Sequence, residues 1–422
     1  MRRVRLGSGL FVFFSQQATM KSLFLRLPLL LLLPATAVHA CGAHADHEQE
    51  WSPEQLAELE RKWGFEWGFS GIGSFAHLKH VKCLTTPGEL FDIGIIGAPF
   101  DTATSYRPGA RFGPRAIRQA SSRQTSFRGF NPRANINPYQ NWATIIDCGD
   151  IPISPMDNAV AIAQMTAAFT ELGHRGTASP LLRKPKLITL GGDHSLALPA
   201  LRALKEIYGK PLRVLHFDAH LDTWHPEKYP SAWPSDQSHF NHGSMFWLAG
   251  NEGLLANASA GPSVHAGLRT RLSGDGWDDF DDDTRQNWVR LSADDIDEIG
   301  TSGIVKAILE SFATPSGEGE EAAPVYLSVD IDVLDPAFAP GTGTPEPGGW
   351  TTRELIRILR GIESLDIVGA DAVEVAPAYQ GAGEETALAA AQVVYEILSS
   401  MVKKGMQDMG RTVRPGERHD EL

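Results

Sequence analysis

The chain has 422 residues, of which 42% are hydrophobic and 21% are charged, and its formal net charge is -13 at pH 7. This length and apolar content suffice for one large α/β domain with a sizeable core. The acidic balance argues against a nucleic-acid-binding protein and favours a cationic partner.

Two targeting signals compete at the N-terminus, where residues 1–40 contain no acidic side chain. Residues 1–19 are basic and resemble a mitochondrial transit peptide, whereas Met20 begins a basic and then apolar stretch that ends before Cys41 like a secretory signal peptide. The apolar stretch is too short for a membrane span. The C-terminal residues 419–422 are HDEL, a sequence that a retention receptor binds in the endoplasmic reticulum. We therefore predict the endoplasmic reticulum lumen, with Met20 as a second candidate start and a mitochondrial location as the alternative.

Two further features of the sequence depend on a secretory location. Asn257 opens an N-A-S triplet, which is an acceptor for N-glycosylation, although many such triplets are never modified. Cys41, Cys83 and Cys148 allow one intrachain disulfide with one thiol left over. Their spacing does not match a metal site, so we interpret the cysteines as non-catalytic.

Apolar runs alternate with helical patterns along most of the chain. Helices are expected at 53–62, 113–122, 156–172, 195–207, 303–312, 351–363 and 388–402, the first of them capped by Ser52. Strands are expected at 91–98, 143–146, near 187 and 214, at 263–267, 288–291 and 325–332, and before Glu374. This alternation predicts βαβ units and a three-layer α/β/α sandwich around a central, mostly parallel sheet.

The expected organisation is a targeting segment (1–40), an N-terminal extension (41–90), a catalytic domain (91–403) and a polar tail (404–422). Within the domain, the basic turn 107–111 lacks a phosphate-binding fingerprint and is interpreted as structural. The acidic segment 275–283 is expected to be a solvated surface turn, and 317–321 a mobile loop. Residues beyond Lys403 are expected to be poorly ordered.

The stretch from Val214 to Asp222 ends an apolar run with three metal-ligand residues spaced two apart, Asp218, His220 and Asp222. Side chains at this spacing turn to one face of an extended strand, provided that the extension continues to Asp222. On its own, the pattern is as typical of a loop as of a ligand set.

Two other stretches supply the same chemistry. Asp330 and Asp332 end the apolar run that begins at Val325, and His194 follows a strand and a Gly-Gly turn. Aspartates that are buried together need a compensating positive charge. Four carboxylates and two imidazoles exceed one tetrahedral zinc site and suit Mn2+ or Mg2+, with the imidazoles favouring Mn2+. The three stretches together predict a two-metal hydrolytic centre.

The sequences G-G-D-H-S, D-A-H-L-D and S-V-D-I-D-V-L-D-P-A-F-A-P-G-T-G-T-P resemble the three metal motifs of the ureohydrolases, most of all those of agmatinases. The resemblance extends from about Gly94 to Met401. It implies a sheet of about eight strands and two Mn2+ ions per chain. It also implies that His194 and Asp222 hold one ion, that His220 and Asp332 hold the other, and that Asp218 and Asp330 bridge them.

Three more positions match functional residues of the family. Glu374, in D-A-V-E-V-A-P, resembles the carboxylate that binds a substrate guanidinium. His242 resembles the loop histidine that orients the substrate or passes a proton to the leaving amine, although His225 and His239 share its loop. Trp224 stands where arginases carry an Asn that helps to bind the amino acid head group, and an apolar ring cannot bind that carboxylate.

The resemblance thus implies a hydrolase of linear amidines that converts agmatine to putrescine and urea in polyamine metabolism. The long loop 224–241 departs from the family pattern and is expected to shape the substrate mouth. A guanidinobutyrase, an arginase and a catalytically silent guanidino-binding protein are therefore the alternatives. A homo-oligomer, either a trimer or a hexamer, is also implied.

Overall fold

The computed structural model describes residues 51–229, 233, 239–313 and 323–410. The targeting segment, the loop 317–321 and the HDEL tail lie outside the described residues. The chain divides into two units, with the boundary after Gly64. The first unit contains helix α1 (Pro53–Trp63), which Ser52 caps through the predicted N-cap arrangement.

The second unit is built on one sheet of eight parallel strands in the order β2-β1-β3-β8-β7-β4-β5-β6. Every residue of β1, β4, β5, β7 and β8 is buried, which explains why these strands are mainly apolar rather than alternating between apolar and polar residues. The strands are β1 (Ile93–Ala98), β2 (Ile145–Asp150), β3 (Lys186–Gly191), β4 (Arg213–Phe217), β5 (Ser263–Leu268), β6 (Trp288–Ser292), β7 (Val325–Asp330) and β8 (Ile367–Val373).

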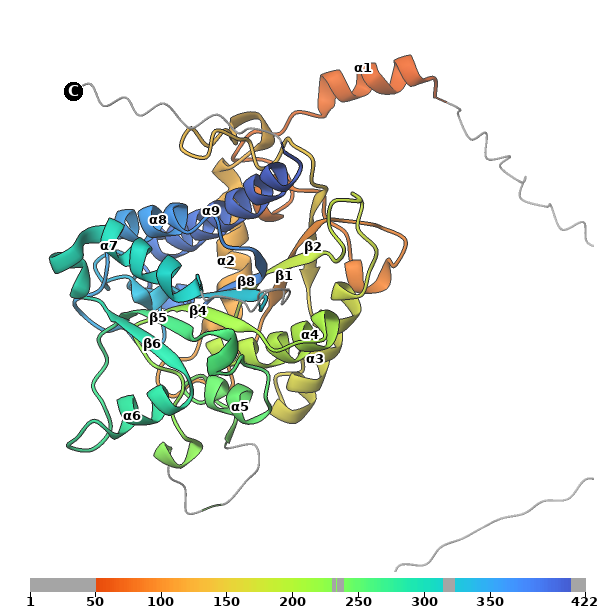
Figure 1. Ribbon diagram of the computed structural model, residues 1–422. Helices are drawn as coiled ribbons and strands as arrows, with labels where there is room; N and C mark the ends of the chain where they lie inside the picture. Colours follow the sequence, from red (N-terminus) through yellow and green to blue (C-terminus); the bar gives the residue numbers. More distant parts are fainter. Residues whose placement is uncertain (1–50, 230–232, 234–238, 314–322, 411–422) are drawn as a thin grey trace, which may run out of the picture. The chain divides into compact units, whose positions relative to one another are not determined.

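Helices cover both faces of the sheet, so the predicted three-layer α/β/α sandwich is confirmed (Figure 1). One face carries α2 (Gly113–Ala120), α7 (Asp295–Phe312), α8 (Thr352–Gly361) and α9 (Glu385–Asp408). The other face carries α3 (Asn158–Gly173), α4 (Ala197–Tyr208) and α5 (Met245–Asn251). None of the helices in the described part of the chain combines the length and apolar character that a bilayer crossing requires.

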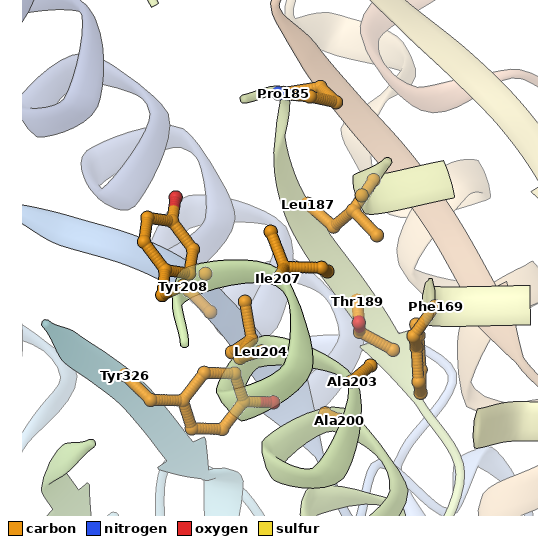
Figure 2. Close-up of a pocket in the computed structure, with 13 residues that line it drawn as sticks. Phe169, Pro185, Leu187, Thr189, Ala200, Ala203, Leu204, Ile207, Tyr208 and Tyr326 are labelled. Atoms are coloured by element: carbon orange, nitrogen blue, oxygen red, sulfur yellow. The ribbon is translucent and has the colours of Figure 1, made fainter. Parts of the chain in front are cut away.

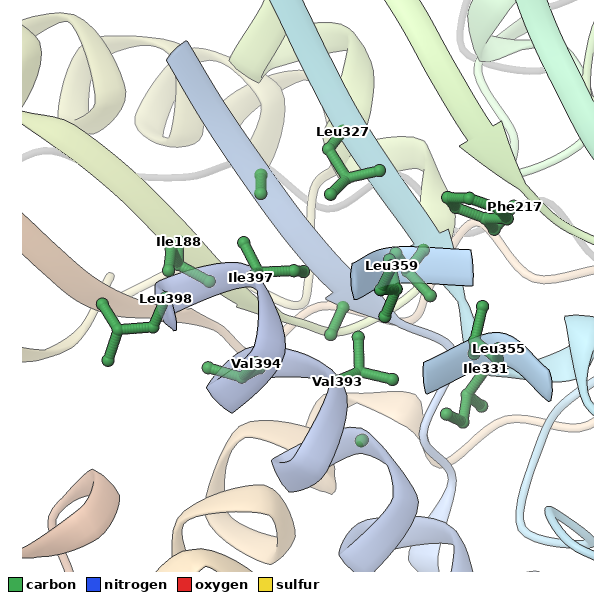
Figure 3. Packing of buried hydrophobic residues seen from close by; sticks show 14 of the residues in the cluster. Ile188, Phe217, Leu327, Ile331, Leu355, Leu359, Val393, Val394, Ile397 and Leu398 are labelled. Atoms are coloured by element: carbon green, nitrogen blue, oxygen red, sulfur yellow. The ribbon is translucent and has the colours of Figure 1, made fainter. Parts of the chain in front are cut away.

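The apolar core is divided between the two faces of the sheet. On one face, Leu359 of α8 and Ile397 of α9 pack toward Ile188 and Leu327 of the sheet (Figure 3). Burying one such side chain stabilises the fold by roughly 1.5–3 kcal/mol. Packing on both faces therefore holds the carboxyl ends of the central strands in fixed positions.

A disulfide joins Cys83, in the segment before β1, to Cys148 in β2, and their Cα atoms lie 5.0 Å apart. Both residues are buried. The sequence left the pairing of the three cysteines open; the structure pairs Cys83 with Cys148, and Cys41 lies outside the described residues.

Several expected boundaries are wrong. The second strand begins at Ile145 rather than 143 and extends to Asp150, and α7 begins at Asp295, eight residues earlier than expected, with a non-helical Gly300 inside it. The last helix continues to Asp408, so residues 404–408 are ordered. The indole of Trp142 donates to the carbonyl of Val402, which anchors this last part of the helix.

The prediction of a solvated turn at 275–283 is also wrong. This segment forms most of helix α6 (Asp278–Arg285), in which Asp279 and Asp283 are buried. Asp283 accepts hydrogen bonds from Thr223 and Arg290, which compensate the charge of a buried carboxylate.

Candidate functional site

The predicted ligands follow three central strands of the sheet at their carboxyl ends. His194 follows β3, Asp218 follows β4, and Asp330 ends β7. Phe217 pairs with Val329 in the parallel register, so the next residues, Asp218 and Asp330, lie side by side. Parallel α/β sheets bind ligands at this edge.

The imidazole of His194 is the centre of one group of candidate ligands. Its Nδ1 atom lies 3.1 Å from Asp218 Oδ2, 3.2 Å from Asp222 Oδ2 and 3.2 Å from Asp330 Oδ2. This nitrogen has no hydrogen-bond partner among the described residues. An imidazole nitrogen that faces three carboxylate oxygens in a buried site is a donor set for a divalent cation.

A second group lies around His220. The Nδ1 atom of His220 is 3.2 Å from Asp218 Oδ1 and 3.1 Å from Asp332 Oδ2. Asp218 therefore presents one carboxylate oxygen to each group, as a bridging ligand would. The structure brings all six predicted residues together in these two groups, while their binding of metal stays a prediction.

The backbone reaches this arrangement differently from the sequence prediction. Strand β4 ends at Phe217, and Asp222 adopts a left-handed conformation with φ 56°. Asp332 lies in the 3-10 turn Ile331–Val333 rather than in a strand. Tight turns, not continued two-residue alternation, thus aim these two carboxylates at the site.

Crowding of the carboxylates perturbs their acidity. Burial, together with the charges of Asp332 and Asp218, raises the pKa of Asp330 well above its usual value. Burial and the Asp218 charge raise the pKa of Asp222 to about 6. The buried carboxylates therefore oppose one another's ionisation, and divalent cations would remove that conflict. Four carboxylates and two imidazoles fit the ligand preference of Mn2+.

Glu374 lies beside the first group, immediately after β8, which is hydrogen-bonded to both β3 and β7. It is fully buried and has φ 61°, a left-handed conformation that costs energy for this residue type. Its Oε1 accepts a hydrogen bond from the backbone N–H of His194 at 2.9 Å. Its Oε2 has no partner among the described residues, although it is buried. That oxygen can accept hydrogen bonds from a cationic ligand.

His242 contacts the same carboxylate. Its Nδ1 lies 3.1 Å from Glu374 Oε1, and its Nε2 accepts a hydrogen bond from the backbone N–H of Ser105 at 3.0 Å. A neutral ring in this arrangement carries its proton on Nδ1. Burial opposes the charged ring, but the hydrogen bond to Glu374 raises the pKa of His242 to about 9, so the ring can carry a second proton at neutral pH. His225, in contrast, packs its ring against Trp247 with centroids 4.5 Å apart, so His242 is the loop histidine that reaches the site.

Trp224 lies near the second group. Its ring centroid is 6.4 Å from that of His220. Its indole N–H donates to Asp279 Oδ2 at 2.9 Å, which fixes the orientation of the ring. The structure thus places this predicted substrate-binding residue beside the ligand cluster.

His216 and Ser328 are polar residues at the site that were not predicted from the sequence. His216 Nε2 lies 2.9 Å from Asp218 Oδ2, and Ser328 Oγ lies 2.7 Å from His194 Nε2. Each lies on a strand two residues before a candidate ligand: His216 on β4 before Asp218, which follows the strand, and Ser328 on β7 before Asp330, which ends it. The two-residue period, followed backward from the ligands, contains the signal that identifies them.

A cavity elsewhere in the fold is separate from this chemistry. It lies between α4 and the sheet and has an apolar lining that includes Phe169, Leu204 and Ile207 (Figure 2). Its polar lining groups are the side chains of Thr189, Tyr208 and Tyr326, and no charged side chain lines it. We therefore assign the function to the carboxylate cluster.

Comparison with known proteins identifies the family. Residues 91–399 match the model of the arginase family. The chain is 48% identical over 344 residues to "Putative agmatinase 1" of Schizosaccharomyces pombe, which covers 79% of this chain and 83% of that protein. It is 36% identical over 336 residues to the agmatinase of Chromobacterium violaceum, with coverage of 80% and 90%.

A solved structure shows the same fold. The proclavaminate amidino hydrolase of Streptomyces clavuligerus superimposes with a TM-score of 0.66 at 34% identity and covers 80% of this chain and 100% of its own. The family match, the parallel sheet and the carboxylate cluster lead to one conclusion. The chain belongs to the arginase family of ureohydrolases, enzymes that hydrolyse the C–N bonds of amidino groups.

Proposed function

We propose that this chain is a dimanganese agmatinase, which hydrolyses the guanidinium group of agmatine to urea and putrescine. The observation that carries the proposal is the two-part ligand cluster beside Glu374 Oε2, a buried oxygen that has no hydrogen-bond partner in the described part of the chain. The first provides ligands for two cations, and the second provides a buried anionic acceptor for a guanidinium. The agmatinases among the relatives support the choice of substrate.

Manganese bound to the cluster would supply Lewis acidity and an activated water at neutral pH. The chain's own residues then position the substrate. Glu374 Oε2 accepts guanidinium N–H groups in a charge-assisted hydrogen bond. His242, held by Glu374 and Ser105, orients the guanidinium and passes a proton to the leaving amine.

Trp224 favours a substrate without an α-carboxylate. Its ring lies beside His220, and its only polar atom already donates to Asp279. An indole in that position offers an amino acid head group no anion-binding contact, whereas the alkyl chain of agmatine can pack against it. Agmatine, which is decarboxylated arginine, therefore fits better than arginine.

The test is urea release by the purified chain after chelation and Mn2+ readdition, with agmatine, arginine and 4-guanidinobutyrate in parallel. Manganese-dependent hydrolysis of agmatine alone is the expected result. Preference for another compound would support amidine hydrolysis but would contradict the assignment of agmatine as the substrate. If the chain binds manganese tightly but releases urea from none of the three compounds, the proposed enzymatic activity is refuted and a guanidino-binding protein is favoured.

We also propose that the protein resides in the endoplasmic reticulum lumen. The signal-like N-terminus, the HDEL tail and the disulfide between Cys83 and Cys148 support this location, because disulfides persist in oxidising compartments.

Asn257 is exposed and precedes the amino end of β5, on the opposite edge of the sheet from the ligand cluster, so a glycan there leaves the site open. Endoglycosidase H should shift the wild-type protein but not Asn257→Gln, and deletion of residues 419–422 should cause secretion. A protein that resists the glycosidase and fractionates with mitochondria would contradict the proposal.

A further inference from the structure

A row of buried polar side chains leads from the ligand cluster toward helix α6. His216 Nε2 lies 2.9 Å from Asp218 Oδ2, and His216 Nδ1 lies 2.8 Å from His265 Nδ1. His265 Nε2 lies 3.0 Å from Asp283 Oδ1. All four residues are at most 1% exposed. We call this row, Asp218–His216–His265–Asp283, the His-Asp chain.

The three contacts of the His-Asp chain depend on one another. The carboxylates at its ends only accept hydrogen bonds, so each end contact requires a proton on the neighbouring ring. The two rings face each other through their Nδ1 atoms, which lie 2.8 Å apart, so neither ring can rotate without breaking this contact. The orientation of each ring is therefore tied to its partners on both sides.

The outer end of the His-Asp chain is anchored by further contacts. Asp283 Oδ1 accepts from the Thr223 hydroxyl at 2.7 Å, and Asp283 Oδ2 accepts from Arg290 Nη1 at 2.7 Å. Trp288 stacks on His265 with ring centroids 4.0 Å apart and an interplanar angle of 13°. Thr223 directly follows the candidate ligand Asp222. Asp283 is thus connected to the cluster by two routes.

We propose that His265 and Asp283 are positioning residues that fix the His216 ring and, through it, the bridging carboxylate of Asp218. The inference rests on the proposed function, because Asp218 must bind metal for its orientation to matter. Asp218 can present one oxygen to each ligand group only in a narrow range of orientations, and the His-Asp chain holds the oxygen that faces His194. Mutating a residue that hydrogen-bonds to a metal ligand typically changes metal affinity or activity by about 10- to 100-fold.

The test uses the full chain with two variants and a matched control. His265→Phe keeps a ring against Trp288 and removes both ring nitrogens, and Asp283→Asn keeps the shape of the side chain and removes its charge. Asp282→Asn makes the same change one position away on α6, where the carboxylate pairs with Arg285 at 3.1 Å and lies outside the His-Asp chain. Manganese affinity and stoichiometry are measured by chelator competition, and the coupling of bound ions by electron paramagnetic resonance.

We expect both variants to bind Mn2+ about 10- to 100-fold more weakly than the wild type and the Asp282→Asn control. His265→Gln, which restores one donor and one acceptor, should recover part of the affinity, and excess Mn2+ should recover part of the kcat of each variant. A merely structural role would lower the melting temperature of the metal-free protein without changing the affinity of the folded fraction.

Unchanged manganese affinity in folded His265→Phe and Asp283→Asn would overturn the inference. If one of these variants does not fold, the other decides together with His265→Gln, which keeps polar atoms at the buried position. A wild-type protein that fails to bind Mn2+ would instead refute the proposed function. The two failures are therefore distinguishable, and neither readout depends on which guanidino compound is the substrate.

Discussion

Replacing Glu374 with glutamine removes one negative charge from the centre of the proposed substrate site with little change of shape. Oε1 of this carboxylate accepts from the backbone N–H of His194 and lies within hydrogen-bond distance of His242, and the amide oxygen of glutamine can keep both contacts. The amide N–H2 group then takes the place of Oε2, the oxygen to which no described residue donates a hydrogen bond. A guanidinium would meet a donor where it now meets an acceptor.

The size of the effect follows from burial. Glu374 is 0% exposed, so water cannot replace the lost acceptor. Truncating one partner of a buried hydrogen-bonded charge pair costs about 2–5 kcal/mol, which corresponds to a roughly 30- to 5000-fold lower kcat/KM. Glu374 is outside the two ligand groups, so manganese binding should stay close to that of the wild type.

The assay is kcat/KM for agmatine at saturating Mn2+, with the metal content of each preparation measured alongside. Glu206→Gln is the matched control, because this exposed glutamate on α4 contacts only His174, at 3.3 Å, among the ion pairs of the described chain. A loss below about tenfold with unchanged metal content would show that Glu374 does not bind the guanidinium.

Three other changes test neighbouring parts of the structure. Asp330→Asn should abolish turnover and weaken both metal sites, because this aspartate faces His194 and is predicted to bridge; near-normal activity would refute bridging. Trp224→Asn should not by itself create an arginase, since the loop after it also differs; substantial urea release from arginine would contradict this. The double variant Cys83→Ala/Cys148→Ala should lose about 2–4 kcal/mol of unfolding free energy in denaturant titration, because the disulfide closes a separation of 65 residues. Equal stability of the variant and the oxidised wild type would show that the crosslink is not a constraint on the unfolded chain.

The sequence predicted the sheet well where a strand is buried on both faces. Val325–Asp330 and Arg213–Phe217 are mainly apolar and buried throughout, and both are strands close to the expected positions. Boundaries were less accurate where a short polar segment adjoins an element. The N-terminal part of α7, before the non-helical Gly300, was missed because it is acidic and carries little apolar periodicity.

Helix α6 shows why tertiary contacts can overrule composition. Its sequence is D-D-F-D-D-D-T-R, which suggests a solvated segment. Asp279 and Asp283 stand four residues apart and so lie on the same face of the helix. Lys228 pairs with Asp279, and Arg290 pairs with Asp283, so the charges on this inner face are compensated by residues outside the helix. That compensation cannot be seen in the segment itself.

The metal-ligand motif of the site could be predicted from the sequence, whereas the residues that support it could not. Asp218, His220 and Asp222 belong to one short motif, so their proximity could be predicted from the sequence, although a left-handed turn at Asp222 rather than two-residue alternation aims that carboxylate at the site. His265 and Asp283 lie on β5 and α6, far along the chain from Asp218, and neither residue type nor spacing connects them to it. Only the parallel pairing of β4 with β5, which sets His216 beside His265, brings them to the ligand cluster. A relative can therefore keep all six ligands and still lack this support, and we expect manganese affinity to differ among relatives whose metal motifs are identical.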